Sequence, residues 1–315
     1  MSELSRLERL KRFFSRTPLP PGVTIGIGDD AAVLAPGGAA LVWTVDAAVE
    51  GVHFRRDWMS LEDIGFRSLM AAASDLAAMG ARPRGVLSAL ILPADFGDAD
   101  LDRLTHGQAE AAAALDTAVV GGNLARGTEL SVTTTVLGAA AKPLLRGGAK
   151  AGDVVAVAGP LGLAAAGIEA LQRGQGGTSF ESALIACRRP RALIDEGVAA
   201  ASRAHAAIDV SDGLALDASR LAVESGVGIV LEAGAVRAAG GAELLAAASA
   251  LSLDPLELAL YGGDDYALLM AFAPGELEPP FRAIGTCTAG DGIVLLGSDG
   301  VRRKLEPRGY DHFRR

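Results

Sequence analysis

The chain contains 315 residues, and its 29 Lys and Arg against 38 Asp and Glu give a net charge of −9 at pH 7. Hydrophobic residues make up 50% of the chain and charged residues 21%, which excludes a disordered protein and predicts a compact fold of about two domains. The acidic balance, with no basic run, argues against a nucleic-acid partner. The only two cysteines, Cys187 and Cys287, are too few for a disulfide framework and favour a reducing compartment.

The sequence also argues against secretion and membrane insertion. The N-terminal segment mixes Arg, Lys and Glu with its Leu and Phe residues, so it lacks the unbroken apolar stretch of a signal peptide. The uncharged stretch at 154–168 contains Gly and Pro and falls short of the roughly 18 apolar residues needed to span a bilayer. We therefore expect a cytoplasmic protein without a membrane partner.

The first half of the chain has the pattern of a mixed α/β unit. Apolar residues at helical spacing predict a short amphipathic helix at the start: Leu4, Leu7, Leu10 and Phe14. Two strands are expected between 23 and 49, joined by a turn at 36–38. Ser60 followed by Asp63 predicts the start of a helix that runs to Gly80, which places Asp75 well inside it.

Further elements follow in chain order and suggest two domains. The first domain is completed by a strand at 85–92, a helix at 98–115 and strands at 117–122 and 129–139, followed by a connector at 142–153. The second contains a strand at 153–159, helices at 161–173 and near 191–203, the segment AIDVSDGLALDASRLAVES at 207–225, a strand at 226–233, an Ala-rich helix, and strands at 266–272 and 292–298. We expect domains at 1–140 and 150–315.

Five acidic clusters are the first candidates for chemistry. They are Gly28-Asp29-Asp30, Asp46 with Glu50, Asp75, Asp209-Val210-Ser211-Asp212 and Gly263-Asp264-Asp265. Taken singly, Asp beside Gly at a strand end is better explained as turn chemistry. Their joint occurrence favours a hard cation, because several partly buried carboxylates need a shared partner. Mg²⁺ prefers carboxylates together with phosphates, so the clusters suggest a nucleotide site.

Three further features admit both a structural and a functional reading. The Gly pair before Asn123 ends a strand, where it allows close approach of a ligand but also suits a β-bulge. Arg146, in a Gly-flanked loop, is either solvated or contacts phosphate. His53 lies seven residues after Asp46, at the rim of the same site or packed as a structural residue.

Common nucleotide and hydrolase motifs are missing from the sequence. There is no GxxxxGK[ST] segment, no GxSxG segment, and GIGDD does not fit GxGxxG. These absences disfavour a Walker-type NTPase, a nucleophile-elbow hydrolase and the usual dinucleotide-binding fold.

The clusters resemble the motifs of the thiamine-monophosphate kinase family, in the superfamily of aminoimidazole ribonucleotide synthetase. The matching segments occur in the family's order and cover nearly the whole chain: GIGDDAAVL, TVDAAVEGVHF, SDLAAMGA, GGNLARG, LLRGGAKAGD, IDVSDGL, YGGDDYALL and GYDHF. The resemblance implies an α/β (α+β) protein of two mixed-sheet domains, with Mg²⁺ and ATP binding and dimerisation in the first. It implies a transferase of thiamine diphosphate biosynthesis that phosphorylates thiamine monophosphate with ATP, as a homodimer.

The resemblance also implies roles for individual residues. Several Mg²⁺ ions would be held by one set of residues: Asp30, Thr44, Val45, Asp46, Asp75, Asp209 and Asp212. ATP would contact a second set: Gly122, Asn123, Arg146 and Ser211. The thiamine phosphate would face His53, Asp264 and Tyr310. The family commonly has Thr at Val45, Asp at Asn123 and Glu at Asp264.

The expected reaction is direct, Mg²⁺-assisted in-line transfer of the ATP γ-phosphoryl group. The attacking oxygen belongs to a phosphate that is already ionised at neutral pH, so no general base is nominated. Three other functions stay open: a related ATP-dependent synthetase acting on another phosphate substrate, a catalytically weakened protein that binds nucleotide or thiamine phosphate, and an Asp-metal phosphatase. Asn123 and Val45 motivate the second of these.

Overall fold

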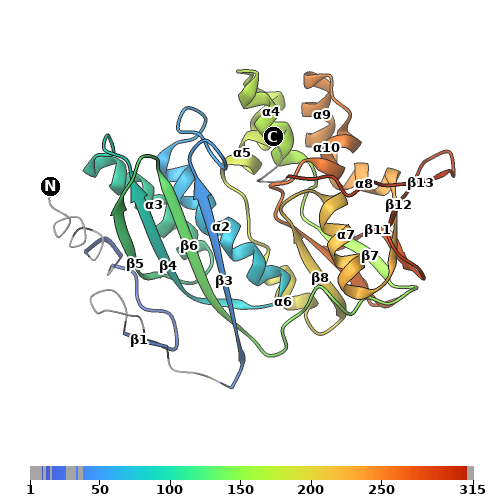
Figure 1. The fold of residues 1–315 in the computed structure, drawn as a ribbon, viewed down its shortest axis with the longest axis horizontal. Helices are drawn as coiled ribbons and strands as arrows, with labels where there is room; N and C mark the ends of the chain where they lie inside the picture. Colours follow the sequence, from blue (N-terminus) through green and yellow to red (C-terminus); the bar gives the residue numbers. More distant parts are fainter. Residues whose placement is uncertain (1–8, 10–11, 15, 26–32, 35–37, 311–315) are drawn as a thin grey trace. The chain divides into compact units, whose positions relative to one another are not determined.

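The computed structural model describes residues 9, 12–14, 16–25, 33–34 and 38–310. The chain divides into two compact units (Figure 1). The first unit consists of residues 1–76 and 81–141, and the second of residues 77–80 and 142–315. Each unit combines a mixed β-sheet with α-helices, so the α/β class with two mixed-sheet domains is confirmed.

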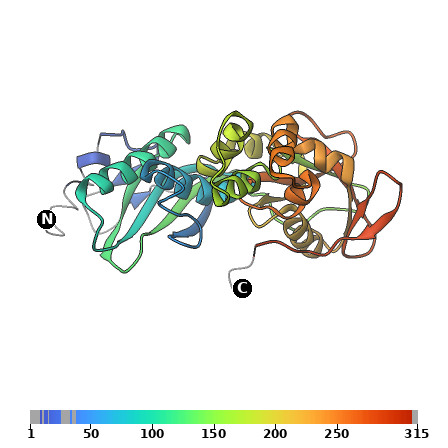
Figure 2. The same cartoon turned by 90° about the horizontal axis from the view of Figure 1, so that it is seen from above.

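The first unit is built on a four-stranded sheet with the strand order β3-β6-β4-β5 (Figure 1). Strands β4 and β5 run parallel, and the other neighbouring pairs are antiparallel. Its elements are β1 (Val23–Ile25), β2 (Val33–Leu34), β3 (Ala40–Val49), α2 (Leu61–Ala78), β4 (Arg82–Leu92), α3 (Asp98–Ala114), β5 (Val119–Arg126) and β6 (Ser131–Ala140). Helices α2 and α3 cover one face of this sheet (Figure 2).

Helix α2 forms where its sequence predicts it. The hydroxyl of Ser60 accepts the backbone N–H of Asp63 at 3.1 Å, which satisfies one of the free donors of the first turn. The chain leaves the helix at Gly80, whose φ of 64° is left-handed and favours glycine. Leu69 and Leu76 are fully buried on the side that packs in the core. The apolar side of α2 therefore fixes its rotation and, with it, the direction of Asp75.

Strand β3 separates polar and apolar side chains by strict alternation. Thr44 and Asp46 lie on the helix-covered face, because Thr44 bonds to helix α2 and strand residues two apart share a face. Leu41, Trp43 and Val45 lie on the other face, with exposed fractions of 55%, 71% and 62%. The sheet thus carries an apolar surface at β3 that no described residue covers.

The second unit contains a seven-stranded mixed sheet with the order β13-β12-β9-β11-β7-β10-β8. Its strands are β7 (Val154–Ala158), β8 (Ala204–Val210), β9 (Gly228–Glu232), β10 (Ala267–Phe272), β11 (Arg282–Thr288), β12 (Ile293–Leu296) and β13 (Arg302–Lys304). Its helices are α4 (Leu163–Gln172), the 3₁₀ helix η1 (Thr178–Phe180), α5 (Glu181–Arg188), α6 (Ile194–Ala200), α7 (Leu214–Ser225), α8 (Ala233–Ala239), α9 (Gly241–Leu251) and α10 (Pro255–Tyr261). Strands β7, β8 and β10 supply the apolar centre, with every residue of β10 buried.

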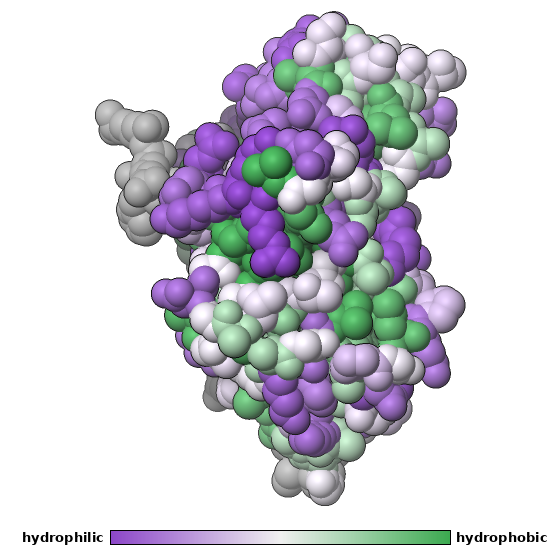
Figure 3. All heavy atoms as spheres, turned by 90° about the vertical axis from the view of Figure 1, so that its right-hand side faces the viewer, coloured by the Kyte–Doolittle hydropathy of each residue, from purple (hydrophilic) through white to green (hydrophobic). Residues whose placement is uncertain are grey.

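No helix of the described residues has both the length and the apolar content of a single membrane span, and only the sharply bent pair α9 and α10 passes such a test jointly. On the face of the molecule seen in Figure 3, hydrophobic side chains form separate patches among hydrophilic ones.

Candidate functional site

Thr44 and Asp75 form a direct contact between the sheet and helix α2 of the first unit. The Thr44 hydroxyl donates a hydrogen bond to Oδ2 of Asp75. Both side chains are half-buried, so the carboxylate is held at the sheet surface and is still accessible to a ligand. The two residues were placed in one metal site by family resemblance, and the structure brings them together.

Asp46 begins a row of small or polar residues that crosses all four strands. Backbone pairing places Asp46 opposite Thr134, Thr134 opposite Ser88, and Ser88 opposite Gly122. The Ser88 hydroxyl and the Gln108 amide of helix α3 are hydrogen-bonded at 2.8 Å, which confirms that the row faces the helices. The buried Thr134 hydroxyl has no hydrogen-bond partner among the described residues. Such a donor and acceptor beside a carboxylate suits a polar ligand or its bound water.

Gly122 sits at the far end of this row, where the backbone packs tightly. A Cβ atom at Gly122 would lie 1.8 Å from the carbonyl oxygen of Ser88, so no side chain can be accommodated without displacing strand β5. Asn123 follows Gly122 and is therefore turned to the opposite, exposed face of the sheet. Val45 is likewise adjacent to Asp46 on its strand and points to the opposite, exposed face of the sheet. Within the first unit, the structure thus groups Thr44, Asp46, Asp75 and Gly122 on one face and directs the side chains of Val45 and Asn123 to the other.

His53 takes part in the local structure that follows strand β3. Its Nδ1 accepts the backbone N–H of Val49 at 3.1 Å, which closes the turn between them. Glu50, which the sequence grouped with Asp46, is instead used in an ion pair with Arg56 at 2.6 Å and accepts the Leu130 N–H at 3.3 Å. The turn therefore orients His53, whereas Glu50 stabilises the fold.

The described residues do not include a ready-made metal cage. No group of three or more His, Cys, Asp and Glu side chains gathers for metal binding within that part of the chain. Asp30, the predicted ligand of the GIGDD segment, lies outside the described residues. The donors that are described, two carboxylates and two hydroxyls, are the hard oxygen ligands that Mg²⁺ prefers. They fit part of a Mg²⁺ site whose remaining ligands would come from phosphate oxygens and water.

In the second unit, five predicted residues gather around the end of strand β8. Asp209 is buried within β8, and Ser211 and Asp212 follow in the turn that leads to helix α7. The backbone N–H of Tyr310 donates to the Asp212 carbonyl at 2.9 Å, although these residues are 98 positions apart. The Ser211 carbonyl accepts the N–H of Asp264 at 2.7 Å. The C-terminal segment and the 263–266 turn are therefore both attached to the Ser211–Asp212 turn.

Two residues that the sequence did not single out control Asp212. Arg220 Nη1 donates to Asp212 Oδ2 at 2.6 Å and to Asp217 Oδ1 at 2.7 Å. The other oxygen of Asp217 accepts the Asp212 backbone N–H at 3.1 Å. Burial raises the pKa of Asp217 to about 6, and the nearby Arg220 partly opposes this rise. The i,i+3 spacing of Asp217 and Arg220 in the sequence was the available signal for this pair.

The turn between α10 and β10 presents two consecutive acids in different surroundings. Asp264 is half-exposed and receives a hydrogen bond from the Tyr266 hydroxyl at 3.1 Å. Asp265 instead accepts the backbone N–H of Gly162 at 2.6 Å, and its Oδ1 is buried without a hydrogen-bond partner among the described residues. Burial raises the pKa of Asp265 to about 8, and the adjacent charge of Asp264 adds a smaller rise.

Arg146 is exposed and lies in the second unit, in the segment that precedes strand β7. Its carbonyl accepts the Ser225 hydroxyl at 3.1 Å, which fixes the backbone. The guanidinium has no ion-pair partner in the described part of the chain and is free to meet an anion. The structure is therefore compatible with both interpretations of Arg146 from the sequence, a solvated arginine and a phosphate contact.

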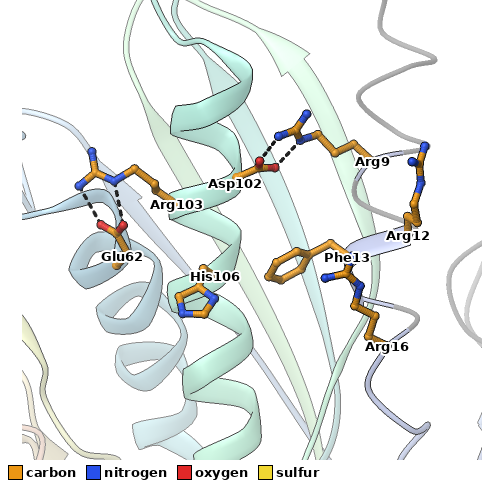
Figure 4. Close-up of a pocket in the computed structure, with 8 residues that line it drawn as sticks. All are labelled: Arg9, Arg12, Phe13, Arg16, Glu62, Asp102, Arg103 and His106. Carbon is orange, nitrogen blue, oxygen red and sulfur yellow. Dashed lines mark hydrogen bonds and ion pairs between the residues drawn. The ribbon is translucent and has the colours of Figure 1, made fainter.

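A cavity of about 660 Å³ in the first unit lies apart from these residues (Figure 4). Two ion pairs cross it, Arg9 with Asp102 and Arg103 with Glu62, and the latter lowers the pKa of Glu62 to about 2. The cavity is lined by Arg9, Arg12, Phe13, Arg16, Glu62, Asp102, Arg103 and His106. None of these is a predicted site residue, and Glu62 lies about 20 Å from Asp75 along α2, at 1.5 Å per residue. The first ion pair attaches the N-terminal segment to α3, and the second joins α3 to α2.

Comparisons with known proteins agree with this arrangement. Residues 28–140 match the N-terminal domain of AIR synthase related proteins, and residues 150–295 match their C-terminal domain. A thiamine-monophosphate kinase of Mycobacterium tuberculosis is 37% identical over 305 residues, which cover 95% of this chain and 89% of that protein.

Solved structures extend the similarity to three dimensions. The structure described as AaThiL complexed with AMPPCP and TMP matches with a TM-score of 0.82 at 30% identity, covering 99% of this chain and 97% of its own. A thiamine-monophosphate kinase from Stenotrophomonas maltophilia matches with a TM-score of 0.80 at 31% identity, covering 97% and 98%. With its two AIR synthase-related domains and end-to-end similarity to these enzymes, the chain belongs to the thiamine-monophosphate kinase family.

Proposed function

We propose that this protein transfers the γ-phosphoryl group of ATP to thiamine monophosphate and so produces thiamine diphosphate and ADP. The observation that carries the proposal is the full-length similarity to thiamine-monophosphate kinases, including the structure complexed with AMPPCP and TMP. The chain retains oxygen donors at the positions this chemistry needs, in the Thr44–Asp75 pair and in Asp46.

We further propose that Mg²⁺ is held by the carboxylates of both units. In the first unit these are Asp30, Asp46 and Asp75, with Thr44 and the backbone carbonyl of Val45 as neutral donors; in the second they are Asp209 and Asp212. When bound, Mg²⁺ neutralises the repulsion between the anionic acceptor and the ATP phosphates. The orphaned Thr134 hydroxyl beside Asp46 supports a polar ligand at this place.

The protein's own residues would act by binding and orientation. Thr44 fixes the direction of the Asp75 carboxylate, and Gly122, which leaves no space for a side chain against the Ser88 carbonyl, lets strands β5 and β4 pack closely at the proposed ATP contact. Ser211 and Arg146 would also contact ATP, with Arg146 balancing its negative charge, whereas Asn123 could do so only through its backbone, because its side chain lies on the other face of the sheet. The attacking oxygen is an ionised phosphate oxygen, so no side chain needs to remove a proton. We therefore propose direct in-line transfer without a phosphoenzyme.

The acceptor would be held mainly by residues of two turns. His53 follows strand β3, and its ring is oriented by the Val49 N–H. Asp264 and Tyr310 are both attached through backbone hydrogen bonds to the Ser211–Asp212 turn, so their positions are coupled. The Asp264 carboxylate would pair with the cationic part of thiamine or with its pyrimidine amine.

We propose that the protein is a homodimer and that the open face of the first unit's sheet forms its interface. Leu41, Trp43 and Val45 supply a row of exposed apolar side chains on β3. On the adjacent strand, Leu137 and Thr135 stand opposite Trp43 and Val45 and extend this surface. An apolar sheet face of this kind is typical of an interface, and a second copy supplies a self-complementary partner. The two buried, free cysteines are compatible with the cytoplasmic location that we also propose.

Incubation of the purified protein with ATP, Mg²⁺ and thiamine monophosphate tests the reaction directly. ADP and thiamine diphosphate should appear in equal amounts, and a sample without acceptor should release little ADP. Phosphate release without acceptor would instead indicate a phosphatase. ATP binding without thiamine diphosphate would contradict the proposal and favour another acceptor or a binding protein, in which case Asn123→Asp should be examined for restored turnover.

A further inference from the structure

The turn between helix α10 and strand β10 has an unfavourable backbone conformation at two residues with side chains. Asp264 has a φ of 59° and Tyr266 a φ of 49°, both in the left-handed region. Such a conformation is unfavourable for a residue other than glycine, so other contacts must hold it. The strained turn includes Asp264, the residue assigned to the acceptor.

Two backbone hydrogen bonds attach this turn to strand β8. The N–H of Asp264 donates to the Ser211 carbonyl at 2.7 Å, and the N–H of Tyr266 donates to the Val210 carbonyl at 2.9 Å. The preceding Gly263 has no room for a side chain, because a Cβ would lie 2.7 Å from the Ser211 oxygen. The two hydrogen bonds and the close approach of Gly263 fix how near the turn lies to Ser211. All three act on the backbone of the turn.

Asp265 supplies the side-chain anchor of the same turn. Its Oδ2 accepts the N–H of Gly162 at 2.6 Å, at the start of helix α4 and 103 residues away in sequence. Gly162 itself lies against α10, since a Cβ there would be 2.6 Å from the Ala259 nitrogen. One buried carboxyl thus joins the turn, α4 and α10 in a single packed arrangement.

Resting on the thiamine monophosphate acceptor proposed above, we propose that Asp265 is a positioning residue that holds the turn and thereby fixes the Asp264 carboxylate for the acceptor. Because the two residues are consecutive, the direction of the Asp264 side chain depends on where the Asp265 side chain is attached. The Tyr266 hydroxyl adds a second restraint through its hydrogen bond to Asp264 Oδ1 at 3.1 Å. The role of Asp265 requires an acceptor for the Gly162 N–H and does not require a negative charge.

The test compares Asp265→Ala with Asp265→Asn by calorimetric binding of thiamine monophosphate, by KM values for both substrates and by thermal melting. Asp265→Ala should weaken thiamine monophosphate binding about tenfold or more, because the turn is no longer held, and leave the KM for ATP within about twofold. Asp265→Asn, which keeps an oxygen for Gly162, should restore binding to near the wild-type value. Unchanged acceptor binding in Asp265→Ala would overturn the proposal.

Asp254→Ala is the matched control. Asp254 also accepts a backbone N–H near the start of a helix, from Leu256 of α10 at 2.9 Å, but it lies outside the 263–266 turn that carries Asp264. Its replacement should lower the melting temperature without changing acceptor binding. If Asp265→Ala does not fold, Asp265→Glu replaces it: it keeps a carboxyl for Gly162 but lengthens the link by one methylene, so it should shift the turn and weaken acceptor binding, and unchanged binding would then overturn the proposal.

The binding measurement separates this inference from the proposed function. Wild-type protein that binds thiamine monophosphate but makes no thiamine diphosphate contradicts the kinase activity, whereas the comparison of the Asp265 variants still decides the role of Asp265. Wild-type protein that does not bind thiamine monophosphate overturns both.

Discussion

The hydroxyl of Thr44, on strand β3, donates a hydrogen bond to the carboxylate of Asp75, on helix α2. This contact joins the sheet of the first unit to the helix that covers it, and it directs one Asp75 oxygen toward β3. The second half of the proposed metal site, Asp46, lies two residues farther along the same strand and on the same face.

Thr44→Val should increase the Mg²⁺ concentration needed for half-maximal activity by about 10- to 100-fold, the usual effect of removing a partner of a metal-binding carboxylate. Asp75→Asn should have a larger effect, because it removes a ligand charge. Activity measured across a Mg²⁺ titration gives the comparison. Thr135→Val is the control, since Thr135 lies on the opposite face of the sheet; equal Mg²⁺ dependence in all three variants would contradict the assignment.

Arg220→Met should lower the free energy of unfolding by about 1–3 kcal/mol, because Asp217 is then buried without its cation and Asp212 loses a hydrogen bond. The half-exposed position of Arg220 places the effect below the 3–5 kcal/mol typical of fully buried pairs. Urea denaturation measures the change. In the control Arg303→Met, the broken pair with Asp299 is exposed to solvent and should contribute little to stability. A similar loss in both variants would show that burial of Asp217 is irrelevant.

Asp265 should make the stability of the protein depend on pH. Its folded-state pKa of about 8 lies above the unfolded value of 3.8, so the folded protein binds the extra proton between these values. The stability contribution is therefore fully present below about pH 4 and decreases as the pH rises toward about 8. The charged group acting on Asp265 is the neighbouring Asp264, which raises the pKa further when ionised.

Asp265→Asn removes this titration. The melting temperature of the variant relative to the wild type should increase from pH 4 to about pH 8 and then level off. Melting curves of both proteins over pH 4–9 provide the measurement. A difference that stays constant over this range would mean that Asp265 is ionised throughout in the folded protein.

Trp43→Asp should convert the proposed dimer into a monomer, because a charge on the open face of β3 would have to be buried without a partner. Light scattering coupled to size-exclusion chromatography measures the mass. Val223→Asp is the control, since Val223 is 73% exposed on α7 of the second unit and lies outside the proposed interface. A monomeric wild-type protein, or a dimer that survives Trp43→Asp, would contradict the proposed interface.

Local signals in the sequence were sufficient for much of the fold. Helix α2 was predicted between Ser60 and Gly80 because a side-chain cap and a left-handed glycine mark its two ends. Helix α5 and strand β11 were not predicted. Helix α5 has only eight residues, and β11 contains Gly285 at an irregular register, so neither shows a clear hydrophobic period.

The candidate site was predictable only in part. Family motifs named Thr44, Asp75 and Asp264, but the partners of these residues depend on tertiary contacts. The sequence could not tell which of the consecutive acids Asp264 and Asp265 is buried, because that depends on Gly162, which lies 103 residues away. The opposite directions of Asp46 and Asn123 likewise require the register of four strands.

The alternation of strand β3 makes one stretch of backbone responsible for two properties. Thr44 and Asp46 lie on the helix-covered face, and Trp43 and Val45 lie on the open face. An insertion of a single residue near Gly38 that shifted the strand by one position would exchange the two sets, placing the carboxylate in the proposed intersubunit contact and a valine against the helices. Evolution of this enzyme can therefore vary the two faces of β3 separately by substitution, but any change in the length of the strand must preserve both at once.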